Sequence, residues 1–321
     1  MKKYLLIRLG AIGDIVLATA AIEAIAQAEP DSQIDFICKA RFAGLLKGHS
    51  KLANIYGFDE TGRHKGLRGL LLFIHELSTK KYNFVIDLQN NPRSRMVTMC
   101  LNGGKKIHWP KDTWRRRMLV WGHGQGKTYK TVIQRYLSAV EKAGIKEPEA
   151  RPKLYPMADP SIKLPQGEFI AIAPGAHWST KRWTGYSELV TKLKTVNYEI
   201  VIVGDNDDKD VADNIIKVSR TRGTDLCGQL DLAQLAYVLS KAKLLVTNDT
   251  GAMHIAEAAG TSALAIFGPT VKQFGFAPWR KESRVIETDL DCRPCSLHGS
   301  NKCPKGKGHL KCMKFITAEQ V

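Results

Sequence analysis

The chain has 321 residues, which is enough for two α/β domains of ordinary size, each with its own core. Its hydrophobic share of 44% indicates a globular protein, and the sequence contains no run of about 20 uninterrupted apolar residues such as a membrane-spanning helix needs. The formal net charge is +17, and residues 1–150 hold 25 basic and 13 acidic residues, a net of +12. This charge favours an anionic partner (nucleic acid, phospholipid headgroups or a phosphorylated substrate) over a basic surface without a role.

The N-terminus imitates a signal peptide, because two lysines precede an apolar stretch. Arg8, Asp14 and Glu23 interrupt that stretch and leave no clean hydrophobic centre. We therefore expect a cytoplasmic protein with reduced thiols.

The first half alternates between predicted strands and helices. Residues 4–7 are a short apolar run, predicted to be a buried strand, and residues 15–28 are an Ala- and Ile-rich helix. The turn between them has the spacing G-x-x-G and not the G-x-G-x-x-G of dinucleotide binding. Asp14 stands at the helix start, where a carboxylate either caps the helix or takes part in catalysis. Further elements are predicted at 34–38 (strand), 67–77 (helix), 84–88 (strand) and 132–143 (helix).

Residues 103–131 differ from the rest, since they are basic, aromatic and glycine-rich. They include Trp109, Trp114 and Trp121 and the run of arginines 115–117. We interpret this segment as a surface that faces a substrate or a membrane. The alternative is a solvated charged loop.

A second alternating block follows a proline-rich stretch, residues 147–165, which is typical of an interdomain linker. Strands are predicted at 169–173, 200–203, 244–247 and 263–267, and helices at 185–195, 232–240 and 252–259. Two such blocks predict an α/β protein with two Rossmann-like domains, residues 1–150 and 151–321, that face each other across a cleft.

The turn Asn248-Asp249-Thr250-Gly251 follows a predicted buried strand and precedes a helix. In open parallel sheets this carboxyl end of a strand is where ligands bind. Gly251 lets the backbone approach closely, Thr250 adds a hydroxyl, and the free N–H groups of the helix start attract an anion. His254 lies in the first helical turn and reaches the same space. A simple helix cap is the alternative interpretation.

Four motifs in order along the chain resemble the ADP-heptose:lipopolysaccharide heptosyltransferases, glycosyltransferase family 9. They are Gly10-Ala11-Ile12-Gly13-Asp14, Pro174-Gly175-Ala176 with Lys181-Arg182-Trp183, Asn248-Asp249-Thr250-Gly251 with His254, and Phe267-Gly268-Pro269-Thr270. The resemblance implies a GT-B fold, with the acceptor bound by the N-terminal domain and the nucleotide sugar by the C-terminal domain. It also implies an ADP-heptose donor, a phosphorylated lipid or core-oligosaccharide acceptor, and inversion at the anomeric carbon.

The same resemblance implies roles for single residues. Asp14 occupies the position of the general base, and Lys181 matches a lysine that contacts the donor and offsets the charge of the departing diphosphate. The expected donor-binding residues are Gly175, Asp225, Asp249, Thr250, Gly251 and His254. Asp225 lies near the place of an acidic residue on the nucleotide ribose. The expected acceptor-binding residues are Arg93, Arg115, Arg116 and Arg117.

Four of the seven cysteines, Cys292, Cys295, Cys303 and Cys312, follow the pattern C-x2-C-x7-C-x8-C near the C-terminus. In a reducing compartment this pattern favours a structural zinc or iron ion, with free thiols and disulfides as alternatives. The cysteines are not expected to act in sugar transfer, which is expected to need no cofactor.

The function predicted from the sequence is thus an inverting glycosyltransferase of the cytoplasm, peripheral at the anionic inner membrane, that binds no nucleic acid. A relative that uses another nucleotide sugar or acceptor is the main alternative. A basic nucleic-acid-binding protein and a nicotinamide-dependent oxidoreductase are two further ones. The oxidoreductase is disfavoured by the missing G-x-G-x-x-G.

Overall fold

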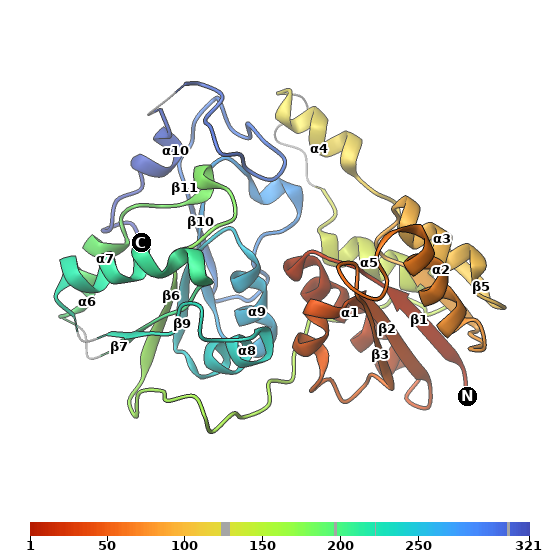
Figure 1. Ribbon diagram of the computed structural model, residues 1–321. Coiled ribbons are helices and arrows are strands. Elements are labelled where there is room, and N and C mark those ends of the chain that lie inside the picture. Colours follow the sequence, from red (N-terminus) through yellow and green to blue (C-terminus); the bar gives the residue numbers. More distant parts are fainter. Residues whose placement is uncertain (123–128, 196–197, 222, 307–308) are drawn as a thin grey trace. The chain divides into compact units, whose positions relative to one another are not determined.

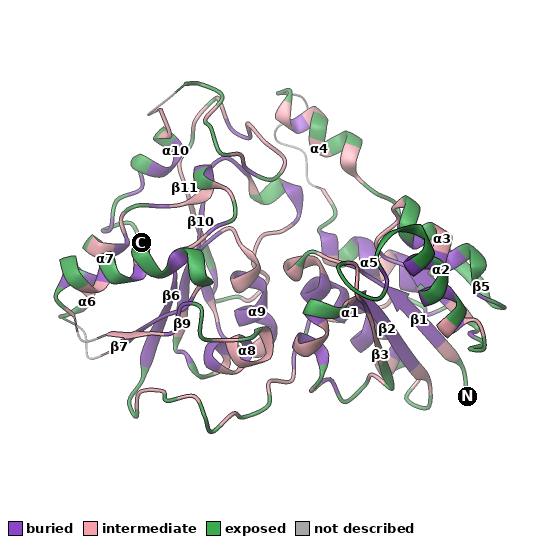
Figure 2. Cartoon of the chain, viewed as in Figure 1, coloured by how far each residue is buried: buried purple, intermediate pink, exposed green. Residues whose placement is uncertain are grey.

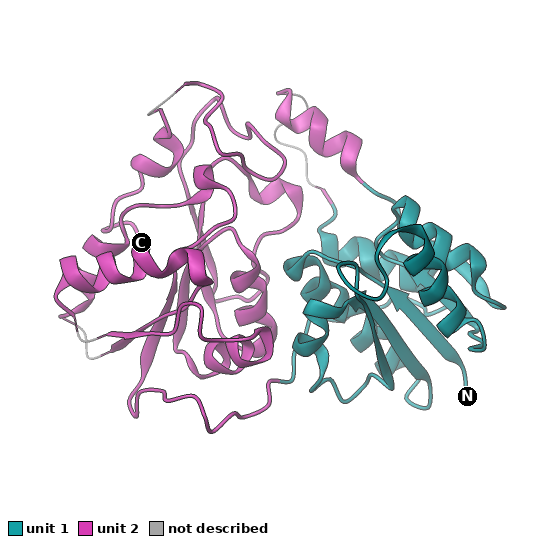
Figure 3. Ribbon diagram, in the orientation of Figure 1, with its two compact units in different colours: residues 1–111, 130–155 teal, residues 112–129, 156–321 magenta. Residues whose placement is uncertain are grey.

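Two parallel β-sheets organise the computed structural model, which describes residues 1–122, 129–195, 198–221, 223–306 and 309–321 (Figure 1). They belong to two compact units, coloured separately in Figure 3. Unit 1 comprises residues 1–111 and 130–155, and unit 2 comprises residues 112–129 and 156–321. The predicted α/β class is confirmed.

Unit 1 has a sheet of order β3-β2-β1-β4-β5, in which all paired strands are parallel. The apolar run predicted as the first strand is its central strand, so Leu6 pairs with Phe36 on one side and Ile86 on the other. The strands are β1 (Lys3–Ile7), β2 (Gln33–Lys39), β3 (Asn54–Phe58), β4 (Phe84–Asp87) and β5 (Lys105–His108). The helices are α1 (Ile12–Ala28), α2 (Gly66–Leu77), α3 (Pro92–Cys100) and α5 (Val132–Glu141), with a 3₁₀ helix at Ala40–Leu46.

The helices of unit 1 pack in pairs, α1 against α5 and α2 against α3. The α1 helix is buried at every position from 15 to 25, as Figure 2 shows by its colour. A helix that is apolar on all sides needs cover on all sides, and the sheet and α5 supply it. This packing fixes the start of α1, where Asp14 lies.

Unit 2 has a parallel sheet of order β11-β10-β9-β6-β7-β8. Its strands are β6 (Phe169–Ala173), β7 (Glu199–Ile202), β8 (Gly223–Asp225), β9 (Leu244–Asn248), β10 (Ala263–Phe267) and β11 (Arg284–Glu287). Its helices are α4 (Thr113–Val120), α6 (Tyr186–Leu193), α7 (Lys209–Ser219), α8 (Leu232–Lys241), α9 (Gly251–Ala259) and α10 (Lys311–Lys314). Short 3₁₀ helices lie at Ser179–Lys181, Asn206–Asp208 and Lys272–Phe274. As in unit 1, the helices pair, α6 with α7 and α8 with α9.

The segment 103–131 is more ordered than a loop. It contains β5 and α4, while residues 123–128 lie outside the described part of the chain. Trp109 is buried and its ring lies 4.8 Å from that of Tyr136, so the expectation of a surface position was wrong for this tryptophan. Trp114 and Trp121 are exposed, as expected. Among the described helices, none combines the length and the apolar character needed to cross a bilayer.

The last residues of the chain belong to the core of unit 2. Met313 and Ile316 are buried in the same cluster as Ile172 and Trp183. The Trp183 indole Nε1 donates a hydrogen bond of 2.9 Å to the Ile316 carbonyl oxygen. The cysteine-rich tail is therefore tied to the centre of the unit at its far end.

This attachment predicts that substitutions at two neighbouring residues change the free energy of unfolding by different amounts. Ile316→Ala removes buried methyl groups and should lower the free energy of unfolding by about 2–4 kcal/mol. Phe315 is exposed, so Phe315→Ala should change it by less than about 0.5 kcal/mol. Urea unfolding of both variants measures the difference. Equal midpoints would show that the tail does not stabilise the core.

Candidate functional site

Each sheet reverses its direction of winding once, between β1 and β4 in unit 1 and between β6 and β9 in unit 2. At such a point the loops that leave the two adjacent strands diverge to opposite faces and leave a crevice at the carboxyl edge, where ligands bind in doubly wound sheets. The predicted site residues follow these four strands in most cases. The places where the winding reverses are called switch points below. The two switch points are the candidate functional sites.

In unit 1 the switch point holds Asp14 in a fixed position. Its Oδ2 lies 2.6 Å from Nη2 of the buried Arg8, and its Oδ1 accepts a hydrogen bond of 3.3 Å from the Tyr136 hydroxyl. Arg8 also donates from Nη1 to the Leu88 carbonyl oxygen at 2.8 Å, which links the ends of β1 and β4. Burial raises the pKa of Tyr136, so its phenol stays protonated and donates.

Asp14 does not cap its helix. The α1 helix begins after Ala11 without a side-chain cap, and both Asp14 oxygens point to partners from other elements. The side chain retains about a fifth of its exposure. The alternative role of a helix cap is thus wrong, and a partly open carboxylate remains at the carboxyl edge.

The last residue of β4, Asp87, adds a second carboxylate, which the sequence did not identify. Asp87 is fully buried and accepts hydrogen bonds from the backbone N–H groups of Gln89 and Asn90 and from the Ser94 hydroxyl, at 2.7–2.9 Å. His108 Nδ1 lies 3.3 Å from its Oδ2. Because its bonds are satisfied within the loop, Asp87 shapes the crevice wall. A charged residue at the end of an apolar strand was the available signal.

In unit 2 the two strands of the switch point are joined by Asn248. Its side-chain nitrogen donates to the Pro174 carbonyl oxygen at 2.8 Å, and its side-chain oxygen accepts from the Trp183 backbone N–H at 3.1 Å. Asn248 thereby links the turn predicted after β9 to the Pro-Gly-Ala and Lys-Arg-Trp motif predicted after β6.

Lys181 and Asp249 form an ion pair of 2.6 Å in this structure, and both side chains are largely buried. Lys181 also donates to the Asp249 carbonyl oxygen at 3.1 Å. The Thr270 hydroxyl donates to the same Asp249 carboxylate at 2.7 Å. Three loops, after β6, β9 and β10, therefore meet at Asp249.

The α9 helix begins at this point without a side-chain cap. Thr250 is the N-cap residue, but its hydroxyl lies 3.2 Å from that of Thr247 and not on the helix backbone. Simple capping by the Asn-Asp-Thr sequence is therefore wrong. The first N–H groups of α9 and its positive dipole end are left to attract an anion beside Lys181.

The other expected donor residues lie along the same carboxyl edge. His254 is buried on α9, with its ring stacked on Trp279 at 5.9 Å. A Cβ atom at Gly175 would lie 2.0 Å from the Asp208 carboxylate, so any other residue there would displace that side chain. Asp225 ends β8, three strands from β9 or about 14 Å, and accepts from the Cys227 N–H at 2.8 Å.

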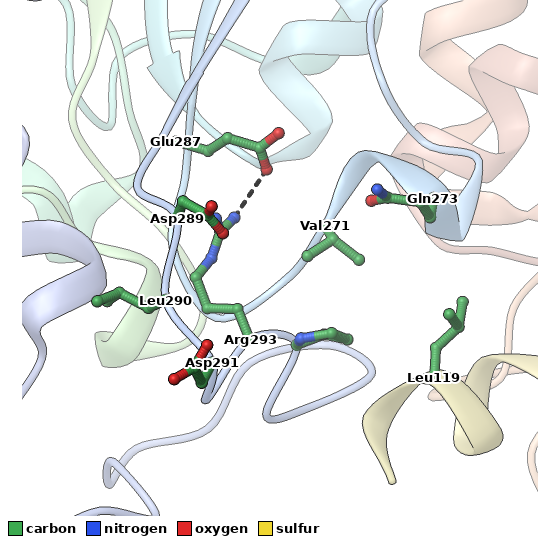
Figure 4. Close-up of a pocket in the computed structure, with 9 residues that line it drawn as sticks. Leu119, Val271, Gln273, Glu287, Asp289, Leu290, Asp291 and Arg293 are labelled. Atoms are coloured by element: carbon green, nitrogen blue, oxygen red, sulfur yellow. Dashed lines mark hydrogen bonds and ion pairs between the residues drawn. The ribbon is translucent and has the colours of Figure 1, made fainter. Parts of the chain in front are cut away.

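Arg293, in the cysteine-rich tail, is a residue that the sequence did not single out. Its buried guanidinium donates to the carbonyl oxygens of Gly268 and Thr270, the latter at 2.9 Å. It also pairs with Glu287 at 2.9 Å (Figure 4). Arg293 thereby holds the loop whose Thr270 hydroxyl binds Asp249.

A surface cavity of about 300 Å³ lies beside Arg293 and contains none of the predicted donor residues (Figure 4). Its lining includes the acidic residues Glu287, Asp289 and Asp291. Three carboxylates against one guanidinium give the lining a net negative charge, so this cavity would repel a diphosphate. The turn after β9 is the better anion site.

The four tail cysteines form no disulfide in the structure. All are free thiols, and in the described part of the chain no three His, Cys, Asp or Glu side chains gather as metal ligands. The Cys295 sulfur lies 4.0 Å from the Pro269 carbonyl oxygen, and burial raises the pKa of Cys312 to about 11. The charges of Cys292, Cys295 and Cys303 raise this pKa further, so the four sulfurs lie near one another. A structural metal ion and free thiols both remain predictions.

The expected acceptor residues divide between the units. Arg93 belongs to unit 1, where it lies 3.4 Å from Glu60 and over the Phe58 ring. Arg115, Arg116 and Arg117 lie on α4, which packs with unit 2. Arg115 pairs with Asp112 at 3.1 Å.

With this geometry described, comparison with known proteins identifies the class. The model of glycosyltransferase family 9 (heptosyltransferase) matches residues 70–305, and the chain belongs to this family. It is similar to lipopolysaccharide heptosyltransferase 2 of Escherichia coli K12, with 24% identity over 99% of this chain and 96% of that protein.

Two solved E. coli structures are also similar and show the same GT-B fold. ADP-heptose lipopolysaccharide heptosyltransferase II has a TM-score of 0.75 at 21% identity, covering 100% of this chain and 96% of that one. Heptosyltransferase WaaC with ADP-2-deoxy-2-fluoro heptose has a TM-score of 0.71 at 20% identity, covering 90% and 94%. The predicted family and fold class are confirmed.

The bonds of Arg293 predict a stability effect. Arg293→Met leaves buried carbonyl oxygens of the 268–270 loop without donors and should lower the free energy of unfolding by about 3 kcal/mol or more. Arg284→Met, at an exposed position of β11, should cost less than about 0.5 kcal/mol. Urea unfolding checks both, and a neutral Arg293→Met would contradict the anchoring role.

Proposed function

We propose that this chain transfers heptose from ADP-heptose to a phosphorylated lipid or core oligosaccharide of the lipopolysaccharide type, with inversion. The observation that carries the proposal is the turn after β9, where Lys181 and the uncapped start of α9 lie together at a switch point. The names of the similar proteins, which act on lipopolysaccharide or bind an ADP-heptose analogue, support the choice of substrates.

In this proposal unit 2 binds the donor. The diphosphate accepts hydrogen bonds from the first N–H groups of α9 and is attracted by Lys181. The nucleoside extends along the carboxyl edge toward Asp225, whose distance of about 14 Å from β9 suits the ribose end of the nucleotide. Gly175 and His254 line the same edge. No metal ion is needed to balance the diphosphate charge.

Unit 1 supplies the base. The Asp14 carboxylate takes the proton of the acceptor hydroxyl as that oxygen forms a bond to the anomeric carbon of the sugar. The bond from that carbon to the phosphate oxygen breaks on the opposite side, and ADP leaves with the electron pair. A single displacement of this kind inverts the anomeric configuration. Arg8 and Tyr136 hold the carboxylate in place.

The acceptor's negative charge agrees with the basic first half of the chain. We assign acceptor binding to unit 1, with Arg93 as an anion contact, and donor binding to unit 2. Arg115, Arg116 and Arg117, which belong to unit 2, are proposed as further anion contacts of the acceptor. A phosphorylated lipid acceptor would place the enzyme at the cytoplasmic face of the inner membrane, as a peripheral protein.

The decisive experiment is a donor panel. Transfer of sugar to a heptose-deficient core acceptor is measured with ADP-heptose, and thermal stabilisation is measured with ADP, UDP and NAD. We expect transfer from ADP-heptose and stabilisation by ADP alone. Stabilisation by UDP instead would reassign the donor, and NAD binding would favour an oxidoreductase.

Asp14→Asn keeps the shape of the base but removes its ability to accept a proton. Turnover should fall by about 10²-fold or more, while ADP affinity stays unchanged because Asp14 belongs to the other unit from the proposed donor site. Asp31→Asn, an exposed carboxylate of unit 1, is the matched control. Full activity of Asp14→Asn at an unchanged unfolding midpoint would remove Asp14 from the mechanism.

Lys181→Met should weaken ADP binding and lower kcat/KM by about 10²-fold, because a cation beside the departing diphosphate is lost. Lys194→Met removes an exposed lysine from the same unit and should have no effect. Calorimetric titration with ADP and steady-state kinetics provide the two measurements. Normal ADP affinity in Lys181→Met would place the diphosphate elsewhere.

A further inference from the structure

The outward face of α2 in unit 1 is unusually apolar. Its inward positions Leu70, Phe73 and Leu77 are buried in the core, as expected for a surface helix. The outward side, however, carries Leu67, Leu71 and Leu72, which are 65%, 48% and 39% exposed. Successive residues of a helix are about 100° apart, so these leucines share one side of the helix, an arc of about 140° that also includes Arg68. Adjacent exposed leucines of this kind mark an interaction surface.

Positive charges lie beside these leucines. Arg68 is exposed one helical turn before Leu72, and exposed Lys65 directly precedes the helix. Among the described residues neither side chain has an ion-pair partner. Exposed leucines next to unpaired cations suit a partner that has an anionic surface and an apolar interior.

We propose that this outward face of α2 docks on an anionic lipid bilayer. The leucines would enter the boundary between headgroups and acyl chains, while Arg68 and Lys65 pair with lipid phosphates. A second copy of the chain fits less well, because a twofold contact through this face would bring Arg68 close to its own symmetry mate. A bilayer satisfies both the leucines and the cations.

The docking surface deepens the proposed function, on which its purpose rests. The α2 helix follows β3 and so begins at the carboxyl edge of the sheet, the edge where Asp14 lies. A bilayer held against α2 would bring a lipid-borne acceptor to that edge. Docking itself needs neither donor nor acceptor, so it is tested without them.

The test is sedimentation of the full chain with phosphatidylcholine vesicles, with and without phosphatidylglycerol. We expect binding only to the anionic vesicles, weakened by salt. The double variant Leu67→Ser/Leu71→Ser should bind at least about tenfold more weakly, and Arg68→Gln about fivefold. Val218→Ser, which changes a 58% exposed residue of α7 in unit 2, should bind like the wild type.

All these positions are exposed, so unfolding midpoints should stay unchanged and loss of binding is not loss of fold. Equal binding of the leucine variant and the wild type would overturn the proposal. So would equal binding to vesicles without anionic lipid, or a dimer in solution that the leucine variant dissociates. Because no sugar is transferred, these outcomes are independent of whether ADP-heptose is the donor.

Discussion

A doubly wound parallel sheet has one place where neighbouring strands send their chains to opposite faces, and this constraint decides where both candidate sites lie. At the ends of β1 and β4 lie Asp14 and Asp87, and after β6 and β9 lie Lys181 and Asp249. The strands themselves are apolar and buried, so polar chemistry can begin only where they end. The sheet therefore determines where the polar side chains lie, and the residues at and after the strand ends provide the reactive groups.

Each site also depends on one buried arginine. Arg8 joins a carbonyl oxygen of the β4 loop to Asp14, and Arg293 joins carbonyl oxygens of the β10 loop to Glu287. A guanidinium offers five donors in a fixed plane, so one side chain can hold several acceptors in a set arrangement. Burying this charge is costly, and the carboxylate partner together with the carbonyl oxygens offsets the cost.

The elements that could be predicted from the sequence are those with a distinctive composition. The apolar runs of β1, β6 and β10 were placed to within one residue, because strands buried on both faces are continuously hydrophobic. The α4 helix was not predicted, since its three arginines obscure its pattern. The α7 helix was also missed, although Ala212, Ile215 and Ser219 lie at helical spacing and are buried. Of the site, the motif residues could be predicted, but their partners Tyr136 and Arg293 could not. These residues come from distant segments and meet the site only through tertiary packing.

The cysteine-rich tail has a structural role that the spacing of its cysteines does not predict. A C-x2-C pattern indicates a metal site or free thiols, and it says nothing of the residue between the two cysteines. Arg293, which lies between Cys292 and Cys295, fixes the loop that holds Asp249 through Thr270. Trp183, two residues after Lys181, is bonded to Ile316 of the same tail. The tail thus supports both the turn after β9, through the loop after β10, and the segment that carries Lys181.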